Sequence, residues 1–144
     1  MPRMKMSMVA ALLVALASVG CGSDGEPATK PQGIPLDLPT SGWEPGDEMM
    51  FAQVGGVLQS DERGCLGFAG SSVPPVWPKG FSAYRHGGTV TLYGPDGEVV
   101  SREGDTVESG GGQVPAGDSL AGSDCLSNGG EVLAVQGEVR VAGD

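Results

Sequence analysis

The sequence predicts an all-β fold, a small antiparallel barrel or sandwich of about five or six strands. Glycine makes up 26 of the 144 residues, and no stretch after residue 45 keeps the apolar period of a helix. Short alternating runs of β-forming residues are separated instead by glycine turns, most clearly between Thr89 and Ser101.

Residues 1–20 have the parts of an export signal. Arg3 and Lys5 provide a positive start, and an uncharged apolar stretch follows from Val9 to Gly20. A helix of that length rises about 18 Å, well short of the roughly 30 Å hydrocarbon core of a membrane. We therefore expect a cleaved signal peptide rather than a permanent spanning helix.

Cys21 stands where the apolar run stops, after the small residues Val19 and Gly20. This pattern resembles the lipobox of bacterial lipoprotein signals, although Ser18 occupies a position where a leucine-like residue is usual. The resemblance implies that Cys21 is lipidated, with palmitate among the acyl chains, and anchors the protein on the extracytoplasmic face of the cell membrane or outer envelope. Ordinary secretion after Ala15-Leu16-Ala17 is the alternative.

The mature chain is strongly acidic. Removal of the signal takes Arg3 and Lys5 from the eight basic residues and leaves the 18 acidic ones, for a net charge of −12. Such a surface repels phosphate backbones, which argues against nucleic acid as a partner. It also disfavours adhesion to anionic headgroups, so we expect the lipid to hold the chain to the membrane.

With Cys21 assigned to lipid, Cys65 and Cys125 remain, and an even pair in an exported domain predicts a disulfide. A metal site is the weaker alternative, because His86 is the only histidine of the chain. We expect no cofactor and no metal.

The domain organisation follows from the prolines. Within residues 21–46, Pro27, Pro31, Pro35 and Pro39 recur every four residues, and such a composition predicts a disordered, semi-rigid linker. We expect one small β domain over residues 47–144.

Within the domain, Met50–Leu58 is a strand candidate in which Gly55-Gly56 predicts a bulge or a bend. Asp61–Gly64 predicts a turn into a strand at Cys65–Phe68. The prolines of Pro74–Pro78 predict an irregular connection or a sheet edge, since proline has no N–H to donate.

The clearest hairpin joins Thr89–Tyr93 to residues 98–101 through Asp96-Gly97, with Val90 and Leu92 facing inward. A last pair, residues 131–135 and 138–141, is expected to turn at Gln136-Gly137. The strand count and the glycine turns favour a five-stranded barrel of the oligonucleotide/oligosaccharide-binding type.

Several short motifs follow one another in the domain: Gly64-Cys65-Leu66, Val76-Trp77-Pro78-Lys79-Gly80-Phe81, Gly97-Glu98-Val99-Val100, Gly104-Asp105-Thr106-Val107 and Gly110-Gly111-Gly112, before Cys125. Their order resembles a set of small exported bacterial domains, mostly uncharacterised and often found in lipoproteins. The resemblance implies a compact β domain with one disulfide, and no established activity.

Four residues are candidates to face a ligand: Trp77, Tyr84, His86 and Tyr93. Trp77 has a second interpretation, which we favour, as a core residue that closes one end of the barrel beside the disulfide. We interpret Gly110-Gly111-Gly112 as a flexible turn, because it lacks the spacing of a phosphate-binding loop. An acidic run is more simply solvated strand edges than a calcium site; it comprises Asp96, Glu98, Glu103, Asp105 and Glu108.

The chain offers little for catalysis. No G-x-S-x-G motif surrounds a serine, and no catalytic residue is assigned. We therefore expect a non-enzymatic binding or interaction module of the cell envelope, with an envelope protein or a glycan as partner. The alternative is a small envelope hydrolase that uses His86 with a loop serine.

Overall fold

The computed structural model describes residues 31–117, 123–126 and 130–143. The expected signal peptide, Cys21 and the first part of the expected linker, up to residue 30, lie outside the described residues. The described part is all-β, as predicted, and contains ten strands rather than five or six. They are β1 (Ile34–Pro35), β2 (Ala52–Ser60), β3 (Leu66–Phe68), β4 (Pro75–Val76), β5 (Ser82–His86), β6 (Thr89–Tyr93), β7 (Val99–Arg102), β8 (Thr106–Pro115), β9 (Glu131–Val135) and β10 (Arg140–Val141).

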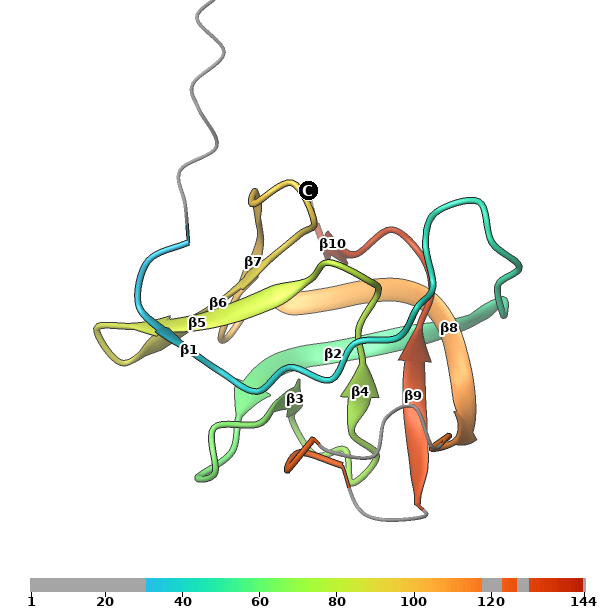
Figure 1. Cartoon of the computed structure of the whole chain (residues 1–144), viewed down its shortest axis with the longest axis horizontal. Coiled ribbons are helices and arrows are strands. Elements are labelled where there is room, and N and C mark those ends of the chain that lie inside the picture. Colours follow the sequence, from blue (N-terminus) through green and yellow to red (C-terminus); the bar gives the residue numbers. More distant parts are fainter. Residues whose placement is uncertain (1–30, 118–122, 127–129, 144) are drawn as a thin grey trace, which may run out of the picture.

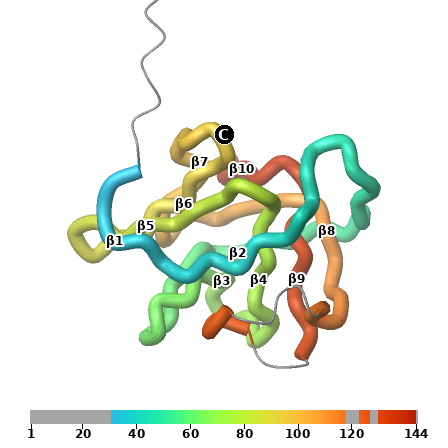
Figure 2. The backbone as a smooth tube through the Cα atoms, viewed as in Figure 1, coloured from blue at the N-terminus to red at the C-terminus, as the bar shows by residue number. Residues whose placement is uncertain are grey.

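The strands form two sheets that share one core (Figure 1). The first is a nearly closed five-strand barrel in the order β3-β2-β8-β9-β4, with β10 added to β8. The second is an antiparallel sheet in the order β1-β5-β6-β7. The barrel is mixed rather than purely antiparallel, because β4 runs parallel to β9. Figure 2 shows β4 and β9 side by side, below the long curved path of β8.

Glycines make the tight barrel feasible. A β-carbon at Gly55 in β2 would overlap the carbonyl oxygen of Val107, and one at Gly111 in β8 would overlap that of Ala134. Both residues have positive φ, 152° and 158°, which suits glycine. Of the bulge or bend expected at Gly55-Gly56, the bulge is wrong, since the register between β2 and β8 runs on without a shift.

The turn expected at Gly110-Gly111-Gly112 is also wrong. These residues lie in the middle of β8, where they pair with β2 on one side and β9 on the other. The absence of a side chain at Gly110 and Gly112 leaves room for the side chains of Met49 and Met50, which a β-carbon at either position would meet. Close packing, and not a change of chain direction, accounts for the glycines here.

The hairpin of β6 and β7 is confirmed, with Val90 and Leu92 fully buried and Gly97 at φ 81° in the turn. The last predicted hairpin is wrong in its pairing. β10 pairs with β8, at Arg140↔Glu108, and does not pair with β9. Gln136 donates its N–H to the carbonyl of Gly110 at 2.9 Å, so the chain just after β9 stays beside β8.

The folded domain begins earlier than residue 47. Ile34 and Pro35 pair with β5, and the N–H of Leu36 bonds the carbonyl of Ala83 at 3.0 Å. Farther on, Thr40 forms a parallel bridge with Trp77. Part of the expected linker therefore docks on the domain, because its leucines pack against the core.

The core joins the two sheets around Trp77, whose side chain has no exposed surface. Its ring lies 5.8 Å from that of Phe68 and 6.3 Å from that of Phe81. The predicted disulfide between Cys65 and Cys125 is confirmed, with 5.4 Å between the α-carbons. The core interpretation of Trp77 is therefore correct, and its assignment as a ligand-facing residue is wrong.

Candidate functional site

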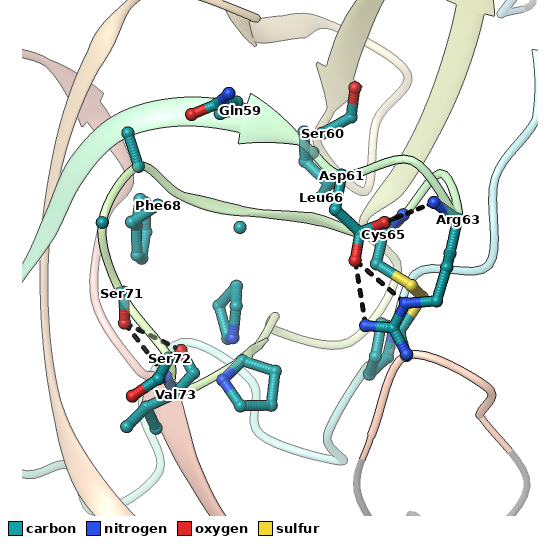
Figure 3. Close-up of a pocket in the computed structure, with 17 residues that line it drawn as sticks. Gln59, Ser60, Asp61, Arg63, Cys65, Leu66, Phe68, Ser71, Ser72 and Val73 are labelled. Carbon is teal, nitrogen blue, oxygen red and sulfur yellow. Dashed lines mark hydrogen bonds and ion pairs between the residues drawn. A yellow bond between two sulfur atoms is a disulfide. The ribbon is translucent and has the colours of Figure 1, made fainter.

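A cavity of about 310 Å³ opens where the barrel fails to close, between β3 and the segment that leads into β4 (Figure 3). We call it the seam cavity. Leu66, Gly67 and Phe68 of β3 form one side, and residues 69–75 curve around the other. The Cys65–Cys125 disulfide and the Asp61–Arg63 pair lie at one end, with Ser71 and Val73 toward the other.

Asp61 organises the disulfide end of the seam cavity. Its carboxylate accepts the N–H of Cys65 at 2.9 Å and pairs with the Arg63 guanidinium, also at 2.9 Å. The hydrogen bond from Cys65, together with those from Arg63, lowers the pKa of Asp61 below its ordinary value. The ionised carboxylate thus holds the turn that delivers Cys65 to the disulfide.

The other half of the disulfide is tied to the N-terminal segment. Cys125 Sγ lies 3.4 Å from the carbonyl oxygen of Asp37, and Ser123 Oγ donates to the Asp37 carboxylate at 2.7 Å. Arg63 also reaches the carbonyl of Asp124 at 3.4 Å. Three segments far apart in the sequence therefore meet at this end of the cavity.

Ser60, in the wall of the seam cavity, links the barrel to the second sheet. Its hydroxyl donates to Glu103 at 2.6 Å and accepts from Arg85 at 3.2 Å. Glu103 also accepts the N–H groups of Ser60 at 2.8 Å and Val90 at 3.3 Å. Partial burial alone raises the pKa of Glu103, but the bonds from Ser60 and Val90 and the charge of Arg85 outweigh it and lower the pKa.

Replacing Glu103 by glutamine is expected to lower the free energy of unfolding at pH 7 by about 1–3 kcal/mol, since bonds to a charged acceptor are lost. The folded pKa lies below the ordinary 4.5, so the stabilisation is complete above about 4.5 and is lost as the pH falls through the folded pKa. Urea unfolding at pH 7 and pH 3 should show the two proteins converging in acid. Glu108→Gln, on exposed β8 surface, is the control; an equal loss there would contradict the assignment.

The outer face of the second sheet brings together the other sequence candidates. Tyr84, Thr91 and Arg102 align in register across β5, β6 and β7, and the rings of Tyr84 and Tyr93 meet edge to face at 5.8 Å. His86, opposite Thr89, lies on the same side. We call this surface the outer face. An open depression of about 780 Å³ lies on it, and Gln32, His86, Thr91, Tyr93, Glu98 and Arg102 are among its lining residues.

The structure bears on two possible activities, hydrolysis through His86 and metal binding by the acidic run. Among the described residues, no hydrogen bond joins His86 to a serine, and no serine lines the depression beside it. The acidic run is dispersed: Glu103 binds Ser60, while Asp105 accepts the N–H of Arg102 at 2.8 Å. In the part of the chain that the structure describes, no group of three metal-ligating side chains gathers.

Residues 31–117, 123–126 and 130–143 include no helix of the length and apolar character needed to cross a membrane.

Sequence reasoning missed the seam cavity and the residues that build it, Ser60, Asp61, Arg63 and Phe68 among them. The turn at Asp61–Gly64 and the edge at Pro74–Pro78 were both expected, and both are confirmed. The two segments come together only in the tertiary structure, and neither local sequence pattern predicts that contact. No protein-family model matches the chain, and no curated protein or solved structure matches it either.

Proposed function

We propose that the protein is a lipid-anchored, non-enzymatic binding module of the bacterial cell envelope, which contacts a glycan or another envelope protein through its outer face. The convergence of Tyr84, His86 and Tyr93 on that face carries the proposal. Tyrosine and arginine are enriched at binding surfaces, because they combine large contact area with a polar end. Arg102, directly opposite Thr91 on the neighbouring strand, supplies the arginine.

The compartment is supported by the disulfide. Cys65 and Cys125 are bonded, and structural disulfides persist where the environment is oxidising. The lipobox-like segment before Cys21 supports attachment by lipid. The absence of a serine beside His86 in the described residues leaves the hydrolase alternative without a supporting contact.

The test places a photoreactive benzoylphenylalanine at Tyr93 in the full chain, in intact cells. We expect a discrete crosslinked species on irradiation, which His86→Ala or Arg102→Ala weakens without loss of the folded protein. The same probe at Phe51, which is 91% exposed on another part of the surface, is the matched control. Identical products from both positions, or none from Tyr93, would reject the outer face as the binding surface.

The anchor is tested in the same cells by labelling with an alkyne fatty acid. Wild-type protein is expected to take up the label and to sediment with membranes, whereas Cys21→Ala loses both properties and keeps its near-UV circular dichroism. An unlabelled wild-type chain would leave secretion after Ala17 as the explanation.

A further inference from the structure

The first half of β2 has a partner strand on one side only. β8 pairs with residues 52–57 of β2, whereas β3 is short and pairs with residues 58–60 on the opposite side (Figure 1). In the part of the chain that the structure describes, no third strand pairs with β2. Residues 51–55 therefore form an open edge on the side of β3, and we call them the β2 edge.

Hydrogen bonds show which main-chain groups face the β2 edge. Ala69, which follows β3, donates its N–H to the carbonyl of Val57 at 2.8 Å, so Val57 faces the side of β3. Since the direction alternates along an antiparallel strand, the main-chain groups of Gln53 and Gly55 point to that side as well. The β8 residue opposite Gln53 agrees with this, because its carbonyl accepts an N–H from the chain after β9, at 2.9 Å, and not from β2.

The β2 edge is open to solvent. Phe51 is 91% exposed, and Ala52, Gln53 and Gly55 are exposed as well. Because Gly55 has no side chain, its exposed surface is main chain. Many edge strands carry charged side chains that prevent further pairing, but residues 49–60 include none. The edge can therefore accept another strand.

We propose that two copies of the protein pair through their β2 edges, as antiparallel strands related by a two-fold axis at Gln53. The two Gln53 residues then exchange main-chain hydrogen bonds, and Phe51 of one copy lies opposite Gly55 of the other. A phenylalanine opposite a glycine covers the bare main chain and loses its own exposed surface. The β2 edge is separate from the outer face, and this proposal does not depend on the function proposed for that face.

The neighbouring chain limits the register. A two-fold axis at Val54 would place Phe51 of the second copy beside Val57, where Ala69 is already bonded. The axis at Gln53 avoids that position for Phe51 and uses the exposed stretch from Phe51 to Gly55.

Charge favours a second copy over an oppositely charged partner. The chain has a formal net charge of −10, so most of its surface repels another copy and attracts basic proteins. The β2 edge has no charge of its own and offers a basic partner no ion pair. A second copy instead supplies the matching pair of Phe51 and Gly55.

The dimer should be weak and should strengthen with salt. An interface built on one short strand pair is small, and we expect a Kd of about 10–100 µM. Salt screens the repulsion between two acidic copies, so association should increase as the salt concentration rises. An interface held by ion pairs would show the opposite trend.

The experiment measures sedimentation equilibrium of the full chain in a density-matched detergent. Gln53→Lys is expected to fold, because its side chain is exposed, and to weaken dimerisation at least about tenfold, because it brings two ammonium groups together at the axis. Thr89→Lys, at an exposed strand position on the outer face, is the matched control and should dimerise like wild type. A wild-type chain that stays monomeric at about 500 µM, well above the expected Kd, would overturn the proposal. So would lysine variants that weaken dimerisation equally, or a loss confined to Thr89→Lys.

A cysteine crosslink tests the register. Directly opposite residues of a hydrogen-bonded antiparallel pair have α-carbons about 5.5 Å apart, within the range of a disulfide. Mild oxidation of the Gln53→Cys variant should therefore give a covalent dimer on a non-reducing gel, and the Thr89→Cys variant should give none. Equal crosslinking of both variants, or none from Gln53→Cys, would reject the two-fold pairing at Gln53.

Discussion

Replacing Trp77 by alanine will lower the free energy of unfolding by about 3–5 kcal/mol, the range for large aromatic residues removed from cores. The side chain has no exposed surface and contacts the rings of Phe68 and Phe81. Its loss leaves a cavity between the two sheets at the point where one core serves both. Urea unfolding followed by far-UV circular dichroism measures the change.

The phenylalanine variant sharpens this prediction. Among the described residues, Trp77 Nε1 has no hydrogen-bond partner. Trp77→Phe therefore removes volume but breaks no hydrogen bond, and it should cost less than Trp77→Ala. Trp43→Phe, at a half-buried site where the indole N–H donates to the carbonyl of Glu48 at 3.1 Å, is the comparison that does break an indole hydrogen bond. Equal destabilisation by Trp77→Phe and Trp77→Ala would contradict this prediction and would indicate that the indole N–H makes a stabilising hydrogen bond.

Removal of the disulfide should have a comparable effect. The bond closes a separation of 60 residues, which corresponds to about 4 kcal/mol in the loop-entropy model. The free energy of unfolding of the Cys65→Ala, Cys125→Ala double variant is expected to be lower by about 2–5 kcal/mol, the range for small exported domains. Cys125 is also 7% exposed, so packing contributes to the loss.

The measurement compares the thermal unfolding of the double variant with that of wild type in the presence and absence of dithiothreitol. Dithiothreitol should lower the wild-type melting temperature toward that of the variant and leave the variant unchanged. Alkylation before and after reduction, read by mass spectrometry, confirms the state of the thiols. Melting curves that coincide for oxidised and reduced wild type would show that the bond contributes nothing to stability.

Local patterns predicted the parts of the fold that depend on neighbours in sequence. The β6–β7 hairpin has strict alternation and a glycine turn, and both were visible in the chain. The triple glycine of β8 was mistaken for a turn because a flexible residue and a closely packed one look alike in sequence. Only the approach of Ala134 and the two methionines distinguishes them.

The long-range strand pairings could not be predicted for a similar reason. The residues near β10 do not indicate that its partner is β8. The prolines around Ile34 are typical of a linker, although this segment pairs with β5. The sequence named Tyr84, His86 and Tyr93 as candidates to face a ligand, but it did not show that they share one face of a sheet. The seam cavity was not predicted, because it exists only where the ends of β2, β3 and residues 69–75 come together.

If Cys21 carries a lipid, as we propose, the docking of Ile34 and Pro35 on β5 also limits how far the domain can move from the membrane. About twelve residues separate Cys21 from Gly33, and a fully extended chain spans at most 3.3–3.6 Å per residue, or roughly 40 Å in all. Gln32, at the end of this tether, lines the same depression as His86. With the proposed lipid on Cys21, the outer face would stay within about 40 Å of its own membrane, and a ligand would have to come within that distance to be bound.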